Sequence, residues 1–324
     1  MEDAVVDRAT GKKFIPVSVD SLILDRQVDF DIYIPTSEAS PPVLYRAKNQ
    51  PFDAAAKNKL EQARVTTFYL CVDDVDVYHS YMENNLDKIV ADKGLSSSRK
   101  AEVVYETARM VMQDVLNDPR SGENIKRSEQ IVTNTVDFIL RDKDAFTCLL
   151  TVTSYDYYTY THSLNVCIYT VALAQRTGIA DLTQLHQLGT GALLHDVGKS
   201  EIDKSILEKK GPLTDEEWVI MKRHPEEGER ILRENVDLPE ASAVVVTQHH
   251  EKCDGSGYPK GLTYNEIHPF ARMAALIDVF DALTTRRPYR EAMEAFAAMK
   301  LMNEEMHDSF DKDIFRDFVL LLGR

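Results

Sequence analysis

The pattern of hydrophobic and polar positions changes near residue 95. Before that point, two helical segments are interspersed with β-type runs: residues 53–64, which Asp53 can cap, and residues 74–90. Three short runs carry the β-branched and aromatic residues typical of strands: FDIYI (30–34), PVLYRA (42–47) and VTTFYLCV (65–72). The pattern predicts a small α/β module over residues 1–95.

From Ser96 onward, apolar residues recur at helical spacing. Residues 96–120 begin with serines that can cap a helix and reach Pro119, so they predict a connecting helix. Residues 121–142 show a second amphipathic pattern, and no later run in the sequence is typical of a strand. We therefore expect residues 121–324 to fold as an all-helical domain. The predicted fold class is mainly α, with a small α/β module preceding the helical domain.

Composition and charge narrow the class of ligand. The 324 residues carry a formal net charge of −15, which argues against a protein that binds DNA or RNA polymers, because such a protein needs a cationic face. A small anionic ligand held at a local cationic site is compatible with this charge. The cysteines form no CxxC pair, the N-terminus shows no apolar targeting segment, and no apolar run is long enough to span a membrane. These features predict a cytoplasmic protein with reduced thiols.

Five of the nine histidines stand at or near predicted helix ends, or on helix faces beside apolar runs. They are His162, His195, His224, His249 and His250. A single histidine in such a position is usually structural, but five of them, together with Asp196, fall within about ninety residues of helical sequence. Neutral imidazole is the commonest metal ligand, and a set of histidines and carboxylates without thiolates favours Fe or Mn over a structural zinc. The pattern predicts a metal site.

Asp196 follows His195 directly at the end of an apolar helix, in LLHDVGK. A carboxylate has two oxygens and can bridge two metal ions. Two metals about 3.5–4 Å apart can clamp a phosphate and hold an activated hydroxide for in-line attack. Asp196 is therefore the candidate bridging ligand and a candidate catalytic residue.

HDVGK with the later HHEKCDGSGYP resembles the HD-GYP family, a branch of the HD phosphohydrolases. Three further segments match the family pattern in its order: TYTHSLNV, RHPEEGERIL and ALIDVFDALTTRRPYREA. The resemblance covers roughly residues 125–310. It implies a helical fold, hydrolysis of cyclic dinucleotides, chiefly cyclic di-GMP, and a centre of two or three metals, usually Fe or Mn. The product, linear pGpG or GMP, stays open.

The resemblance assigns the metal ligands in two groups. His195, Asp196 and Asp278 would hold the first metal, with His162 in some members of the family. Asp196 and three histidines would hold the second: His224, His249 and His250. Family members with a third metal carry a glutamate one helical turn before the histidine that matches His162. Tyr158 occupies that position here, and because the pKa of tyrosine is near 10, we expect two divalent metals rather than three.

The resemblance also assigns residues that contact the substrate. Lys199 would direct its ammonium at a phosphate oxygen and stabilise charge in the transition state. Arg287 and Arg290, in RRPYR, match positions that grip ligand phosphates, a role that suits the planar fork of arginine. The alternative for these two arginines is a solvated run of charges.

A second signature surrounds Gly257, Tyr258 and Pro259. Its glycines allow a tight loop and its proline stiffens that loop. The resemblance places Asp254, Gly257 and Tyr258 among the substrate-binding residues, with Tyr258 at the mouth of the site. Packing of the loop is the alternative role for Tyr258.

Two other functions are compatible with the same residues. The first is a phosphodiesterase for another cyclic dinucleotide, such as cyclic GMP-AMP, because nothing in the sequence identifies the base pockets. The second is a receptor that binds a cyclic dinucleotide without hydrolysing it, which the complete ligand set disfavours. The N-terminal module carries no ligand motif. We expect it to be regulatory or sensory, and it could mediate a homodimer or bind a signalling partner.

Overall fold

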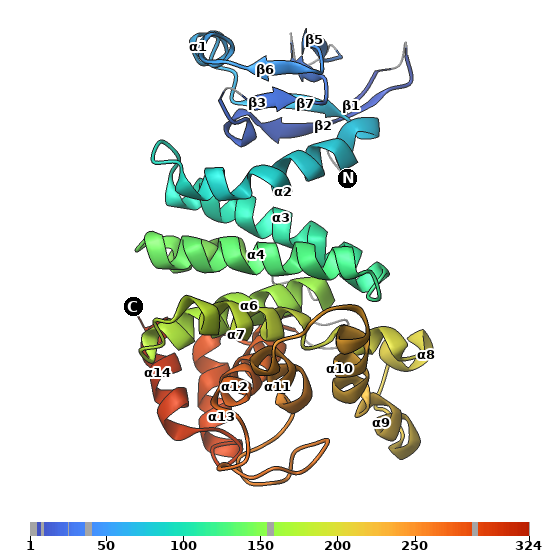
Figure 1. Cartoon of the computed structure of the whole chain (residues 1–324), viewed down its shortest axis with the longest axis vertical. Helices are drawn as coiled ribbons and strands as arrows, with labels where there is room; N and C mark the ends of the chain where they lie inside the picture. The colour runs from blue at the N-terminus through green and yellow to red at the C-terminus, as the bar shows by residue number, and fades with distance from the viewer. Residues whose placement is uncertain are drawn as a thin grey trace. The chain divides into compact units, whose positions relative to one another are not determined.

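The computed structural model describes residues 5–7, 10–24, 26–35, 41–153, 159–286 and 291–323. The chain forms two compact units, Met1–Thr107 and Ala108–Arg324 (Figure 1). The division falls inside helix α3 (Ser97–Asn117), the helix expected from the serines at its start. The domain boundaries near residues 95 and 120 stay a prediction.

The first unit contains a five-stranded antiparallel sheet with strand order β1-β2-β7-β4-β5. Its strands are β1 (Val5–Val6), β2 (Lys13–Ser18), β4 (Ile32–Ile34), β5 (Val43–Arg46) and β7 (Thr67–Cys71). Strands β3 (Arg26–Val28) and β6 (Gln50–Phe52) pair separately. The three predicted strands are confirmed as β4, β5 and β7. Sequence reasoning did not identify β2, which contains Pro16. Among the described residues, β1 pairs with β2 at Lys13 and Phe14, and Pro16 lies opposite Tyr69 of β7.

Two helices complete the first unit. Helix α1 (Ala54–Gln62) begins after Asp53, whose side chain accepts a hydrogen bond from the backbone N–H of Ala56, as its predicted cap should. Helix α2 (Val75–Ala91) places the rings of Tyr78 and Tyr81 at 5.4 and 5.5 Å from the fully buried ring of Phe30. Short 3₁₀ turns cover Val19–Ser21 and Val72–Asp74. An aromatic cluster therefore joins α2 to the strands.

The second unit is helical, which confirms the predicted fold class. Its first helices are α4 (Gly122–Arg141), α5 (Ala145–Val152), α6 (Thr159–Arg176) and α7 (Leu182–Leu194), followed by the 3₁₀ turn η3 (Val197–Glu201) and α8 (Lys204–Leu207). The later helices are α9 (Asp215–Met221), α10 (His224–Asn235), α11 (Glu240–Gln248), α12 (Pro269–Thr284), α13 (Ala295–Glu305) and α14 (Lys312–Leu322). None of the helices in the described ranges combines the length and apolarity needed to cross a membrane.

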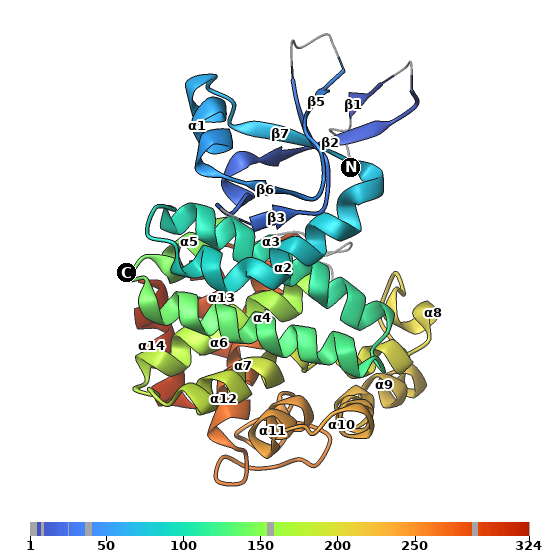
Figure 2. The same ribbon diagram turned by 45° about the horizontal axis from the view of Figure 1, so that its top comes forward.

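Helix α6 forms the centre of this unit. Between Thr161 and Ala174 only Tyr169 is not fully buried, as expected for a helix surrounded by other helices. Helices α4, α5, α7, α12 and α14 all contact it, and α11 contacts α7 and α12. Figures 1 and 2 show α8, α9 and α10 together on one side of the unit, and α13 and α14 on the other. This packing brings the ends of several helices to one place.

Candidate metal centre

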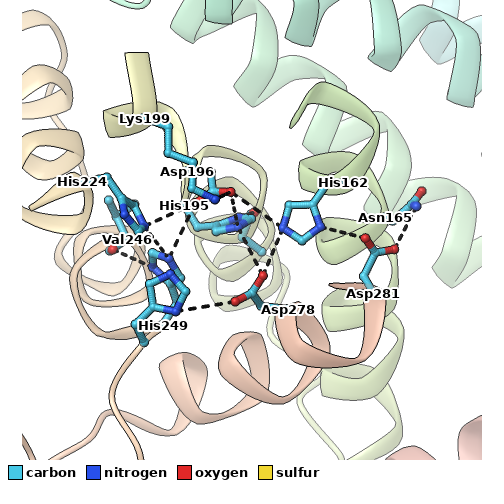
Figure 3. Close-up of polar contacts among 12 residues, drawn as sticks. His162, Asn165, His195, Asp196, Lys199, His224, Val246, His249, Asp278 and Asp281 are labelled. Carbon is cyan, nitrogen blue, oxygen red and sulfur yellow. Dashed lines mark hydrogen bonds and ion pairs between the residues drawn. The ribbon is translucent and has the colours of Figure 1, made fainter. Parts of the chain in front are cut away.

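The side chains of seven residues converge where these helices meet, and Figure 3 labels all of them except His250. They are His162 in the first turn of α6, His195 at the C-cap of α7, Asp196 before η3, His224 at the start of α10, His249 at the C-cap of α11, His250 next to it, and Asp278 in α12. The structure therefore brings together every residue that the sequence nominated as a metal ligand.

The ligand-type atoms fall into two groups, each within 4.8 Å. One group contains His162, His195 and Asp278; the other contains Asp196, His224, His249 and His250. Asp196 faces both. Its Oδ1 lies 3.4 Å from His224 Nε2, and its Oδ2 lies 3.4 Å from His195 Nε2. This is the arrangement that a bridging carboxylate requires.

The ends of the helices fix the orientation of three imidazoles. Each ring places Nδ1 against the backbone carbonyl three residues earlier: His195 to Ala192 at 2.7 Å, His224 to Met221 at 2.8 Å and His249 to Val246 at 2.8 Å. Carbonyls in the last turn of a helix lack helical partners and are free to accept. These contacts assign the proton to Nδ1, so the Nε2 lone pair of each ring points into the cluster.

A carboxylate orients the fourth imidazole. Asp281 accepts a hydrogen bond from His162 Nδ1 at 2.7 Å and from Asn165 Nδ2 at 2.9 Å, and all three residues are buried. The other ring nitrogen, Nε2, then lies 3.0 Å from Oδ1 of Asp278. Sequence reasoning missed Asp281. The signal was its position three residues after Asp278, which puts both carboxylates on one face of α12.

The donor set fits divalent cations. The Nε2 atoms of His224 and His249 lie 3.2 Å apart, and with both protons on Nδ1 these are two lone pairs facing each other. His195 Nε2 and Asp196 Oδ1 are buried, and neither has a hydrogen-bond partner among the described residues. Buried acceptors without partners are costly. A cation among them would remove both the repulsion and the missing interactions.

The electrostatics of the cluster suit metal binding as well. Burial lowers the pKa of His224 to about 4 and that of His250 to about 3, and it holds the pKa of His249 well below its ordinary value. These rings are therefore neutral at pH 7, as metal ligands must be.

The two carboxylates are ionised in the same environment. Burial opposes the charged form of Asp196, but Lys199 and His195 bring its pKa well below the ordinary value. Burial likewise opposes ionisation of Asp278, but the nearby rings of His162, His250 and His195 together lower its pKa. The centre thus combines neutral imidazoles with anionic oxygens.

The cluster has one accessible side. Most of its side chains are at most 1% exposed, but Lys199 is 16%, Asp278 12% and His250 23% exposed. Lys199 Nζ lies 2.5 Å from Asp196 Oδ2 (Figure 3). A ligand reaching the cluster from this side therefore meets the Lys199 ammonium together with His250 and Asp278.

Tyr258 borders the same opening. Its ring stacks on His250 with the centroids 4.6 Å apart, and Lys222 Nζ lies 5.6 Å from the centre of the tyrosine ring. Burial raises the pKa of the Tyr258 hydroxyl, so it is a neutral hydrogen-bond donor. The structure thus places Tyr258 at the rim of the cluster, where the sequence had expected it.

Backbone contacts hold the loop that carries Tyr258. The Asp254 carboxylate accepts from the backbone N–H of Ser256 at 2.8 Å and from the Ser309 hydroxyl at 3.2 Å. A Cβ at Gly257 would lie 2.4 Å from Lys252 N and 2.6 Å from the His250 carbonyl oxygen, so only glycine fits. These contacts give Asp254 and Gly257 a role in building the loop, beside the substrate contacts predicted for them.

Glu251 is a second residue that sequence reasoning missed. It is buried, and its two oxygens accept from the backbone N–H groups of Lys260 at 2.7 Å and Leu262 at 2.8 Å. This carboxylate ties the end of the loop to the backbone position directly after His249 and His250. Its position directly after the paired histidines was the available signal.

A close backbone approach joins the HD pair to α10. A Cβ at Gly198 would lie 2.0 Å from the His224 carbonyl oxygen and 2.5 Å from the Gly228 backbone nitrogen. No other residue permits this approach, which sets Asp196 beside His224. The glycine of HDVGK is therefore part of the geometry of the centre.

Three residues of the sequence-based hypothesis lie outside the described residues. They are Tyr158, the reason for expecting two metals, and the phosphate-gripping candidates Arg287 and Arg290. Their assignments stay predictions.

Comparison with known proteins identifies this helical region. Residues 157–314 match the family model described as HD domain. A cyclic di-GMP phosphodiesterase of Pseudomonas aeruginosa is 36% identical over 230 residues, which cover 69% of this chain and 54% of that protein. A 3′3′-cGAMP-specific phosphodiesterase of Vibrio cholerae is 38% identical over 158 residues, covering 49% of this chain and 34% of that protein. This region therefore contains an HD domain, which confirms the resemblance seen in the sequence.

A solved structure shares the fold of nearly the whole chain. It is a HDG"Y"P protein from Bdellovibrio bacteriovorus, with a TM-score of 0.67 and 22% identity, covering 96% of this chain and 100% of that one. At that identity the likeness shows the fold alone. The chain spans about half the length of the Pseudomonas relative and a third of the Vibrio relative.

Proposed function

We propose that the helical unit is a metal-dependent phosphodiesterase that hydrolyses cyclic di-GMP to linear pGpG. The observation that carries the proposal is the convergence of neutral imidazole lone pairs and two carboxylates at one accessible point, with Lys199 beside it. The names of the relatives, cyclic di-GMP phosphodiesterases among them, support this choice of substrate.

Two cations would be held by the two groups. One site would use His162, His195 and Asp278; the other would use the three remaining histidines, with Asp196 between the two sites. The ligand atoms are nitrogen and oxygen without thiolate, a set that favours Fe or Mn. When bound, such cations polarise a phosphate oxygen and supply a nucleophile from water at neutral pH.

Residues of the chain itself orient the imidazole rings and balance charge on the phosphate. The Lys199 ammonium, at the accessible side, is placed to balance charge that develops on the phosphate oxygens. The backbone carbonyls and Asp281 hold the imidazole rings in one orientation, so little reorganisation accompanies the reaction. The Tyr258 hydroxyl, kept neutral by burial, can donate to a bound phosphodiester.

A mixed cyclic GMP-AMP is the second candidate substrate. It is favoured by a specific observation, since relatives of comparable identity are named 3′3′-cGAMP-specific phosphodiesterases. The chemistry at the metal centre is the same for both substrates, so the discrimination must lie in contacts with the bases.

The experiment is hydrolysis of a panel of cyclic dinucleotides by anaerobically purified protein supplied with Fe or Mn. We expect turnover of cyclic di-GMP to pGpG, and loss of both turnover and at least one metal in Asp196→Ala. Asp313→Asn, an exposed aspartate on α14, is the control and should keep full activity. Metal-loaded wild-type protein that binds cyclic di-GMP without hydrolysing it would make the chain a receptor instead.

A further inference from the structure

A pocket of about 480 Å³ lies beside the candidate centre. It is lined by the corner between α3 and α4, the start of α6, the turn η3 and the short helix α8. Ligand pockets in proteins are commonly about 300–1,000 Å³, so this one has room for one nucleoside half of a cyclic dinucleotide. Neither the proposed metal ligands nor the loop of Tyr258 accounts for it.

The pocket adjoins the metal cluster at Lys199. Lys199 lines it while placing its Nζ on Asp196. Thr159 also lines it and lies three residues, about one helical turn, before His162. A ligand with one phosphate at the cluster can therefore extend past Lys199 into this space.

The charge of the lining is opposite to that of the chain. Arg120, Lys199 and Lys204 line the pocket together with the single carboxylate of Glu201, whereas the whole chain carries a net charge of −15. A cyclic dinucleotide has two phosphates, and only one can occupy the cluster. With Lys199 at the scissile phosphate and Arg120 facing the base, Lys204 is the lining cation left for the other phosphate.

We propose that this pocket binds the half of the cyclic dinucleotide remote from the scissile phosphate and that Arg120 and Glu201 select a guanine there. The inference rests on the proposed function. Arg120 and Glu201 lie 2.9 Å apart as an ion pair, with side chains 49% and 33% exposed. Arg120 also lies 3.8 Å from Glu234, and Glu201 lies 3.8 Å from Arg230, with all four side chains between 33% and 50% exposed. Exposed ion pairs are weak, so a base edge can align with this pair at little cost.

The order of hydrogen-bonding groups on guanine matches this pair. Its Watson–Crick edge presents an acceptor, O6, followed by donors at N1 and N2. Arginine can donate to the first and glutamate can accept from the others. Adenine presents a donor at N6 and an acceptor at N1, which places like groups together and leaves polar groups unpaired. The pair therefore prefers guanine over adenine.

The test is steady-state hydrolysis of cyclic di-GMP by Arg120→Ala and Glu201→Gln, with bis(p-nitrophenyl) phosphate as a small phosphodiester that reaches only the cluster. We expect Arg120→Ala to raise KM for cyclic di-GMP about tenfold and to leave hydrolysis of the small ester and metal content unchanged. Glu201→Gln should lower the preference for cyclic di-GMP over cyclic di-AMP about tenfold. This preference is measured as the ratio of the two inhibition constants against hydrolysis of bis(p-nitrophenyl) phosphate. Arg233→Ala, which breaks a comparable exposed pair on α10, is the matched control.

An unchanged KM in Arg120→Ala would overturn the inference and leave the proposed function intact. Equal losses of activity by Arg120→Ala on cyclic di-GMP and on the small ester would also overturn it. Arg120 would then support the metal centre rather than contact the ligand. Calorimetric binding of cyclic di-GMP separates the two claims. Binding by the wild type that Arg120→Ala weakens, without turnover, would refute the phosphodiesterase and keep the pocket. A wild type that neither binds nor hydrolyses would refute both.

Discussion

The two compact units bury different kinds of side chain. The core of the first unit centres on apolar and aromatic residues such as Phe30, Phe52 and Phe68, each fully buried. Asn85, a buried polar side chain of this unit, donates locally to the Tyr81 carbonyl at 2.8 Å. This is the pattern of a core built for stability.

The second unit buries imidazoles and carboxylates at its centre. Several of their polar atoms face one another, and His195 Nε2 and Asp196 Oδ1 lack partners in the part of the chain that the structure describes. Unpaired buried polar atoms lower stability. The difference indicates that the binding site lowers the folding stability of this unit, and that bound metal would restore that stability.

The largest effect on activity is expected from Lys199, at the accessible side of the cluster. Lys199→Ala should keep both metals and lower kcat by roughly 100-fold, the effect of removing one donor to a developing charge. Kinetics and elemental analysis of the same sample measure both quantities. Lys312→Ala, an exposed lysine on α14, serves as the control. A normal rate in Lys199→Ala would remove Lys199 from the mechanism.

The orientation of His162 provides the next test. Asp281→Asn keeps the shape of the side chain but removes the charge that accepts from His162 Nδ1. Loss of such a partner typically weakens metal affinity about 10–100-fold. Competition with a chelator would measure this in Asp281→Asn and in the exposed control Asp313→Asn. Equal affinity in the two variants would mean that Asp281 only packs against α6.

Acid should destabilise the metal-free helical unit before the first unit. The pKa of His224 is lowered to about 4 by burial, so below its ordinary value near 6.5 the unfolded chain binds more protons than the folded chain. Stability therefore falls as pH drops from 6.5 to 4, by about 3 kcal/mol for this group alone.

Hydrogen exchange of metal-free protein checks this directly. Peptides from α10 and α11 should lose protection over that pH range, whereas peptides from β2 and β7 should keep it, because no histidine is among the buried residues described in the first unit. Uniform loss in both units would contradict the contrast drawn between them.

Much of this architecture was predictable because it depends on local patterns. The cap at Asp53 and the helix ends at His195 and His249 follow from neighbouring residues. The ligands were recognisable because their motifs are short and ordered. The cytoplasmic location remains a prediction, as does the binding of a second copy or a signalling partner through the first unit.

Other features depend on tertiary contacts that no local pattern reveals. The bond between Asp281 and His162 spans 119 positions. The close approach of Gly198 to α10, and the pocket that Arg120 and Glu201 line, exist only once separate helices have packed. Strand β2 was missed because Pro16 is normally a strand breaker, and its pairing with β7 depends on residues distant in the sequence.

The most direct test of the central claim is anomalous scattering from crystals of anaerobically purified, metal-replete protein. We predict two peaks, one beside His162, His195 and Asp278, the other beside His224, His249 and His250, with Asp196 between them. A single peak, a third fully occupied site, or metal bound elsewhere would contradict the two-metal centre.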